Sequence, residues 1–283
     1  MLGVENQVFH LSFSGHCQTR HYILKVFCRE RCLVTTFSFH QKTVLVRSLI
    51  KACIPVASVL AYRELKNAIC FMLLEYLPGK PRLTSEADLL TVCEMLRRIQ
   101  SIPAEKTGVE YPNTYRDLFS QSQDKLSLVL VHGDYHLGNF LWSGDKMCGI
   151  VDWDTVHLGF PEEDVAHCFI DLLALTNEYL AKRFLHICKS VLCLDEKRLL
   201  YFLSVDAEYT LNNYRKWENG FFGKNLAISD KELKERLIPI VNNHHQPLIE
   251  RRQTMIKEIE VVETPKDIIE ETGKAICGMT CSG

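Results

Sequence analysis

Apolar and polar positions divide the chain into a strand-rich beginning and a helical remainder. Residues 7–27 contain two apolar runs separated by a turn-rich link, which predicts a hairpin, and residues 40–52 place apolar side chains at helical spacing. Strand-like runs follow at 56–61 and 68–74, and Pro and Gly break the pattern within residues 75–79. Residues 1–78 are therefore predicted to form a small β-rich lobe with one helix.

Helical spacing dominates the rest of the sequence. Residues 85–100 and 113–127 are predicted to be helices, and the pattern is mostly helical from Pro161 to about Met255. Between these segments, residues 128–154 form a short β-rich island. We expect a large helical lobe over residues 79–260 and a charged, loosely held tail over residues 261–283.

Composition argues against several classes of protein. The 283 residues include 33 Lys and Arg against 35 Asp and Glu, so the net charge of −2 gives no general attraction to nucleic acid or anionic lipid. No apolar run approaches the roughly 20 residues of a membrane-spanning helix, and the first residues lack the pattern of a signal peptide. The 12 Cys are scattered without a C-x2-C pair, which favours reduced thiols. We expect a soluble, cytoplasmic protein that binds neither nucleic acid nor membrane.

The β-rich island holds the side chains that are best suited to chemistry. Its sequence over residues 129–154 is VLVHGDYHLGNFLWSGDKMCGIVDWD, which places Asp134, Asn139 and Asp152 at the ends of short strands. Rigid strands commonly present functional groups on such loops. Asp134 and Asn139 have the D-x4-N spacing of the protein-kinase catalytic loop, and Asp152 follows in the place of the metal-binding Asp of the next loop.

The motif H-G-D-x-H-x-x-N followed by V-D-W-D resembles the aminoglycoside phosphotransferase and choline kinase family, over about residues 3–220. This resemblance implies an α+β, bilobal protein-kinase-like fold and transfer of phosphate from ATP to a hydroxyl of a small molecule. It also implies that Asp134 is the catalytic residue that orients this hydroxyl and accepts its proton, while Asn139 and Asp152 bind Mg²⁺. Leu137 replaces the proline that the family usually has, which should leave the chemistry intact. Aminoglycoside phosphorylation, with antibiotic resistance as its outcome, is the leading activity.

Nucleotide contacts are expected from the N-terminal lobe. Lys25 is a single charge in an apolar strand, so it is either buried against an anion such as the phosphates of ATP or an edge-strand lysine that faces water. The resemblance implies the first role, together with main-chain contacts to adenine from Glu75 and Leu77. An ordinary strand end would also explain Glu75 and Leu77. Gln41 stands at the position where the family has a Glu that pairs with this lysine. Residues 3–6 stand where the family has a turn that covers the phosphates.

An acidic segment bears on the acceptor. Residues 155–181 contain five acids and neither Lys nor Arg, and further acids and aromatic residues follow in a helical context. Carboxylates beside aromatic faces suit a cationic acceptor such as an aminoglycoside or an amino alcohol. A solvated helix with acids at its N-terminus is the alternative. The residues concerned are Glu162, Glu163, Asp164, Asp171, Glu178, Asp206, Glu208, Tyr209, Tyr214 and Trp217.

Three alternative functions remain open. The chain could be a kinase for choline or another amino alcohol. It could also be a non-catalytic module that binds nucleotide without turnover, which Gln41 and the glycine-poor residues 3–6 favour. Finally, it could be a metal-dependent hydrolase with His132 and His136 as ligands, although the resemblance makes His132 structural.

Overall fold

The structure is a computed structural model that describes residues 6–14, 19–28, 39–65, 69–82, 84–109, 128–217 and 228–242. The chain divides into two units, Met1–His245 and Gln246–Gly283, and every described residue belongs to the first. The predicted helix over residues 113–127, the tail and most of the predicted turn at residues 3–6 lie outside the described residues.

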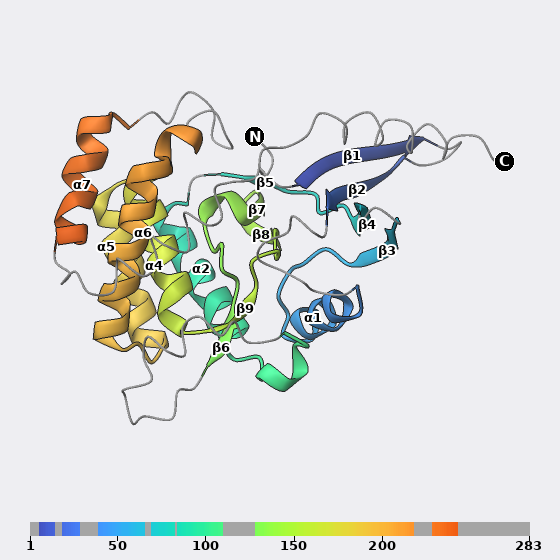
Figure 1. Cartoon of the computed structure of the whole chain (residues 1–283), viewed down its shortest axis with the longest axis horizontal. Coiled ribbons are helices and arrows are strands. Elements are labelled where there is room, and N and C mark those ends of the chain that lie inside the picture. Colours follow the sequence, from blue (N-terminus) through green and yellow to red (C-terminus); the bar gives the residue numbers. More distant parts are fainter. Residues whose placement is uncertain are drawn as a thin grey trace. The chain divides into compact units, whose positions relative to one another are not determined.

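The described residues of the strand-rich beginning form four antiparallel strands and one helix (Figure 1). The elements are β1 (Asn6–Ser14), β2 (Thr19–Cys28), α1 (Phe39–Lys51), β3 (Val59–Glu64) and β4 (Ile69–Glu75). The strand order is β1-β2-β4-β3, so β2 is an internal strand in which Lys25 pairs in register with Val8 on one side and Met72 on the other. The predicted hairpin and helix are confirmed. The alternative that Lys25 lies on an edge strand is wrong for this reason.

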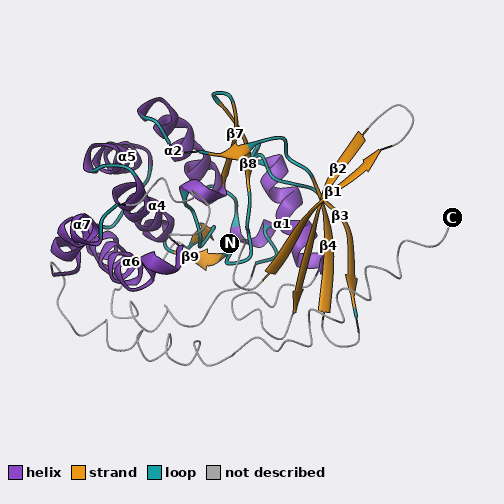
Figure 2. Cartoon of the chain, turned by 90° about the horizontal axis from the view of Figure 1, so that it is seen from above, coloured by secondary structure: helices purple, strands orange, loops and turns teal. Residues whose placement is uncertain are grey.

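In the described part of the helical remainder there are five longer helices, and four of them pack against one another next to α2 (Figure 2). They are α2 (Glu86–Gln100), α4 (Pro161–Leu175), α5 (Glu178–Val191), α6 (Glu196–Trp217) and α7 (Asp230–Asn242). Helix α4 contacts α5, α6 and α7, because most of its side chains after the first turn are apolar and buried. None of the described helices is both long and apolar enough to cross a membrane.

Two small sheets place the β-rich island against these helices. Strands β5 (Lys80–Pro81), β7 (Phe140–Ser143) and β8 (Lys146–Ile150) form one sheet, and β6 (Val129–Val131) pairs with β9 (His157–Gly159) in the other. The β-rich island predicted over residues 128–154 is confirmed, with β7 and β8 as its hairpin, whereas β9 is not predicted. Strand β6 leads into the loop that carries Asp134, and β8 leads to Asp152, so the pairing of short strands positions both side chains.

Candidate active site

The loop of residues 132–139, called the HGD loop below, joins β6 to β7 and is fixed at its first turn. Gly133 has a φ of +81°, and a Cβ there would stand 2.4 Å from the carbonyl oxygen of Thr155, so glycine is required. The N–H groups of His132 and Gly133 donate to the carboxylate of Asp164 at 2.7 and 2.9 Å. Asp164 is buried in the first turn of α4, where the helix dipole favours an acid. It therefore anchors the loop.

His132 is a buried brace between the HGD loop and the end of β8. Its Nε2 lies 3.0 Å from the carbonyl oxygen of Val151, and its Nδ1 accepts the N–H of Asp134 at 3.3 Å. These partners require a neutral ring with its proton on Nε2. Burial lowers the pKa of His132 to about 4, in agreement with a neutral ring. Both nitrogens are engaged, so His132 has no lone pair left for the metal of a hydrolase. Among the described residues, no group of three or more His, Cys, Asp or Glu is arranged to hold a metal ion.

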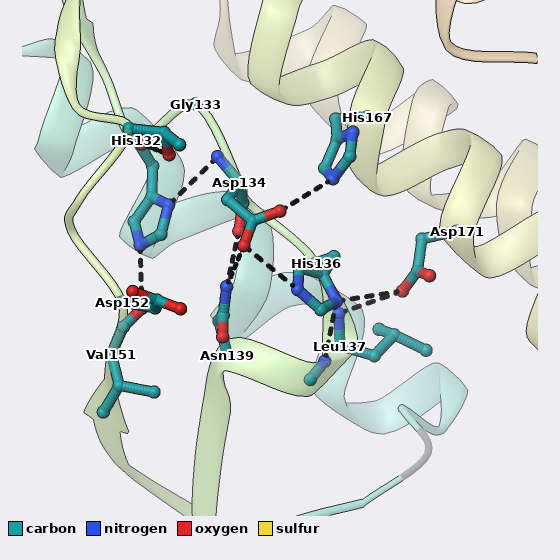
Figure 3. A network of polar contacts seen from close by, with 12 residues as sticks. His132, Gly133, Asp134, His136, Leu137, Asn139, Val151, Asp152, His167 and Asp171 are labelled. Atoms are coloured by element: carbon teal, nitrogen blue, oxygen red, sulfur yellow. Dashed lines mark hydrogen bonds and ion pairs between the residues drawn. The ribbon is translucent and has the colours of Figure 1, made fainter. Parts of the chain in front are cut away.

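Asp134 and Asn139 belong to one polar network, and Asp152 lies beside it (Figure 3). Asn139 Nδ2 donates to the carbonyl oxygen of Asp134 and to its carboxylate Oδ2, each at 2.9 Å. The carbonyl oxygen of Asn139 accepts the N–H of Val151 at 3.0 Å, which brings Asp152, the next residue, beside the loop. Asp152 has a φ of +62°, an uncommon conformation for a residue other than glycine. The HGD loop, with Asp134 and Asn139, and the segment after β8, with Asp152, thus lie next to each other.

The orientation of Asn139 directs an oxygen away from Asp134. Both contacts with Asp134 need a donor, so Nδ2 faces Asp134 and Oδ1 faces the other way. The carboxylate of Asp152 lies near other charged groups. Desolvation raises its pKa, and the negative charges of Asp154 and Asp134 raise it further, whereas Lys25 opposes the shift. A divalent cation would relieve the repulsion, and Mg²⁺ accepts a few amide and carboxylate oxygens beside phosphates and waters. The donor set therefore fits a magnesium ion.

Lys25 reaches this network from β2. It is 7% exposed, its Nζ lies 2.9 Å from Asp152 Oδ1, and it also contacts the carboxylate of Asp154. Burial alone would lower the pKa of Lys25, but Asp154 and Asp152 outweigh it and the pKa is raised, so the side chain is charged. Helix α1 contributes Lys42, which follows Gln41 in the sequence. The Nζ of Lys42 lies 3.1 Å from Asp154 Oδ1. Among the described residues, the buried Lys25 is thus paired with two carboxylates, and its contact with phosphates stays a prediction.

Glu75 and Leu77 flank the exit from β4. The N–H of Glu75 donates to the carbonyl oxygen of Ser58 at 3.0 Å, and the carbonyl oxygen of Leu77 accepts the N–H of Gly79 at 2.9 Å. Their main-chain contacts with adenine stay a prediction.

Comparisons with known proteins bear on the fold and the family. Residues 115–186 match the model of the phosphotransferase enzyme family, and this matched segment contains the HGD loop and Asp152. No curated protein matches the chain in sequence. Among solved structures, the aminoglycoside phosphotransferase APH(4)-Ia is 17% identical with a TM-score of 0.58, over 87% of this chain and 92% of that chain.

Two further structures give similar values. A thermostable mutant of APH(4)-Ia, in ternary complex with ADP and hygromycin B, is 17% identical with a TM-score of 0.56, over 86% and 92% of the two chains. The GDP complex of aminoglycoside 2'-phosphotransferase-IIIa is 14% identical with a TM-score of 0.50, over 84% and 93%. The fold is that of the aminoglycoside phosphotransferases. The predicted α+β, protein-kinase-like architecture is confirmed, and the family resemblance is confirmed over residues 115–186.

The five acids of residues 155–181 each have a partner within this chain. Glu162 is fully buried and binds Arg198, and Glu163 binds His157 and the N–H of Phe160. The other partners are the HGD loop for Asp164, the N–H of Leu137 for Asp171 and Lys182 for Glu178. These contacts favour the structural interpretation of Glu162, Glu163 and Asp164. Tyr214 is 6% exposed, and the side chain of Trp217 lies outside the described residues.

Three residues of the site are not singled out from the sequence: Lys42 and Asp154 join the Lys25 cluster, and His167 contacts Asp134 from α4. Asp206, which the sequence places among the candidate acceptor acids, contacts His167 from α6. His167 lies three residues after Asp164, hence on the same face of α4, but no sequence pattern places that face against the HGD loop.

Proposed function

We propose that this protein is an ATP- and Mg²⁺-dependent phosphotransferase that acts on a hydroxyl of a small cationic molecule. Aminoglycosides are the leading acceptors, with antibiotic resistance as the outcome, and choline or another amino alcohol is the second choice. The observation that carries the proposal is that Asp152 follows Val151, which is hydrogen-bonded to Asn139, so that it lies beside the bonded pair Asp134 and Asn139, with the buried Lys25 against its carboxylate. The proposal includes a cytoplasmic location, where ATP is present.

In this proposal Asp134 is the catalytic residue. Desolvation opposes its ionisation, but His136 and His167 outweigh this effect, so the pKa of Asp134 lies well below its usual value. An ionised Asp134 accepts a hydrogen bond from the acceptor hydroxyl and takes its proton as the new O–P bond forms. A weak base suits this role because the transition state of phosphoryl transfer is loose and positioning dominates. Its side chain is 36% exposed, which leaves it accessible to an acceptor.

Nucleotide and metal are assigned to the remaining predicted residues. Asn139 and Asp152 hold Mg²⁺, which when bound neutralises charge on the phosphates. Lys25 binds the phosphates, and the main chain of Glu75 and Leu77 contacts adenine.

The preference for a cationic acceptor is supported by the charges around Asp134. Three carboxylates, Asp134, Asp171 and Asp206, face two imidazoles, His136 and His167. The group is therefore negative even when both imidazoles are protonated, and it attracts cations. We expect the KM for a cationic acceptor to rise with ionic strength because salt screens this attraction. A KM that is the same at low and high salt contradicts electrostatic capture of the acceptor.

Binding of nucleotide is tested first, by thermal unfolding with ATP in the presence and absence of Mg²⁺. A ligand at a hundredfold excess over its Kd stabilises the folded state by about 2.7 kcal/mol. We expect stabilisation by ATP that is stronger with Mg²⁺. A non-catalytic module would show this stabilisation without turnover. A metal hydrolase would be indifferent to ATP and would hold zinc or iron tightly.

Turnover is tested by ATP consumption across a panel of aminoglycosides, choline, amino alcohols and uncharged polyols. We expect turnover by the native protein with a cationic acceptor and a loss of about 10²–10⁴ in rate for Asp134→Asn. Asp145→Asn is the matched control, because Asp145 lies exposed in the turn between β7 and β8. Equal turnover by the native protein and Asp134→Asn removes Asp134 from its proposed role.

A further inference from the structure

Asp134 lies at the centre of a chain of alternating carboxylates and imidazoles (Figure 3). On one side, His136 Nε2 lies 3.4 Å from Asp134 Oδ2, and its Nδ1 lies 3.9 Å from Asp171. On the other side, His167 Nε2 lies 3.3 Å from Asp134 Oδ1, and its Nδ1 lies 3.6 Å from Asp206 Oδ1. The second pair belongs to α4 and α6, outside the sequence motif.

The contacts of His167 determine its charge. Each ring nitrogen faces a carboxylate, and a neutral imidazole would have to direct a lone pair at one of them. Only the doubly protonated ring avoids this repulsion. Burial opposes the charge, but Asp134 and Asp206 outweigh it and raise the pKa of His167 well above its usual value. The facing groups are Asp134 and His136 from the HGD loop, Asp206 from α6 and Asp171 from α4 itself.

His136 differs from His167 in the role of its second nitrogen. Its Nδ1 accepts the N–H of Gly138 at 3.2 Å, as the cap of the short helix Leu137–Asn139. In this geometry His136 contacts Asp134 through Nε2, and Asp134 together with Asp171 raises the pKa of its ring although burial opposes the charge. His167 differs because both of its ring nitrogens face carboxylates within 3.6 Å and neither accepts a backbone N–H.

The two oxygens of Asp134 are not equivalent. Oδ2 accepts from Asn139 at 2.9 Å and faces His136 at 3.4 Å, which occupies both of its lone pairs. In the part of the chain that the structure describes, Oδ1 contacts His167 alone, so one lone pair of Oδ1 is left. An acceptor hydroxyl would therefore bind Oδ1, next to His167.

We propose that His167, held by Asp206, is a positioning residue that directs Asp134 Oδ1 at the acceptor hydroxyl. The inference rests on the proposed phosphotransferase function. As the acceptor oxygen bonds to the γ-phosphorus, the bond between that phosphorus and the ADP oxygen breaks. The hydroxyl proton passes to Asp134 Oδ1, and His167 keeps both of its protons. His167 acts on the acceptor through Asp134 and has no contact with the nucleotide.

Kinetics of variants test this role. We expect His167→Ala to lower kcat about tenfold to a hundredfold with an unchanged KM for ATP, because misplacing a reacting group by about 1 Å costs up to a hundredfold. His167→Gln can place an amide N–H near Oδ1 and is expected to recover part of the loss. His186→Gln is the matched control, since His186 is exposed on α5. A kcat for His167→Ala equal to that of the native protein overturns the inference.

Nitrogen NMR of the imidazole rings gives a readout that does not depend on turnover. We expect both ring nitrogens of His167 to be protonated at pH 7 in the native protein. In Asp206→Asn, which lacks one stabilising carboxylate, we expect the ring to lose its second proton at a lower pH than in the native protein. A neutral His167 ring at pH 7 overturns the inference even if the Ala variant fails to fold. Absence of turnover by the native protein with every acceptor overturns the proposed function and this inference with it, whereas turnover with a neutral ring overturns the inference alone.

Discussion

His132 makes the stability of the fold depend on pH in a defined direction. Its folded pKa of about 4 lies below the ordinary value of 6.5, because the buried ring must stay neutral between Val151 and Asp134. Between about pH 4 and pH 6.5, His132 in the unfolded chain therefore binds a proton that it does not bind in the folded chain. The stability that His132 contributes is complete above pH 6.5 and is lost as the pH falls towards 4. The difference of about 2.5 pH units corresponds to about 3 kcal/mol of unfolding free energy.

Urea unfolding of the native protein and His132→Asn at pH 7.5 and pH 4 measures this contribution. Asn carries no titrating group, so the variant does not lose the roughly 3 kcal/mol of unfolding free energy that His132 costs the native protein on going from pH 7.5 to pH 4. The variant is less stable at pH 7.5, where the native brace is intact, and we expect the stability gap to shrink by about 3 kcal/mol at pH 4. His186→Asn, at an exposed position, should follow the native protein at both pH values. A gap between native protein and His132→Asn that is the same at pH 7.5 and 4 refutes the reasoning.

Three further substitutions test the packing around the site, each by urea unfolding. Asp164→Ala leaves two buried N–H groups of the HGD loop without their acceptor, and at about 1–3 kcal/mol each we expect a loss of several kcal/mol. Lys42→Ala removes a cation that contacts Asp154, with an expected loss of about 1–3 kcal/mol, and an unchanged midpoint would exclude Lys42 from the cluster. Tyr135→Phe removes a hydroxyl that donates to the carbonyl oxygen of Val92 at 2.7 Å, and should cost about 1 kcal/mol without changing the m-value.

The parts of the site that could be predicted from the sequence depend on local order. The hairpin that ends before Asp152 follows from alternating apolar residues around a Ser-Gly-Asp turn, and these signals lie within a dozen residues. The spacing of Asp134 and Asn139 is equally local, because a loop of five residues lets the amide turn back onto the carboxylate. Strand β9 was missed because its three residues, His157–Gly159, are too few to show a period.

Partners that are distant in sequence could not be predicted. Lys25 contacts Asp154, 129 residues away, and Lys42 reaches the same carboxylate from 112 residues away. A lysine in an amphipathic helix such as α1 is ordinarily a solvent-facing residue, so no pattern marks Lys42. The acidic segment shows the same limit, since composition counts the charge of Glu162 but not its contact with Arg198, 36 residues further on.

The central claim is that Asn139 and Asp152 hold the metal of a bound nucleotide beside Asp134. An experimental structure of the protein with Mg²⁺ and a non-hydrolysable ATP analogue tests it most directly. The account predicts one Mg²⁺ with Asn139 Oδ1 and a carboxylate oxygen of Asp152 at about 2.1 Å, and with phosphate oxygens completing its ligands. A metal bound by His136 or His167, or a nucleotide bound away from these residues, would contradict it.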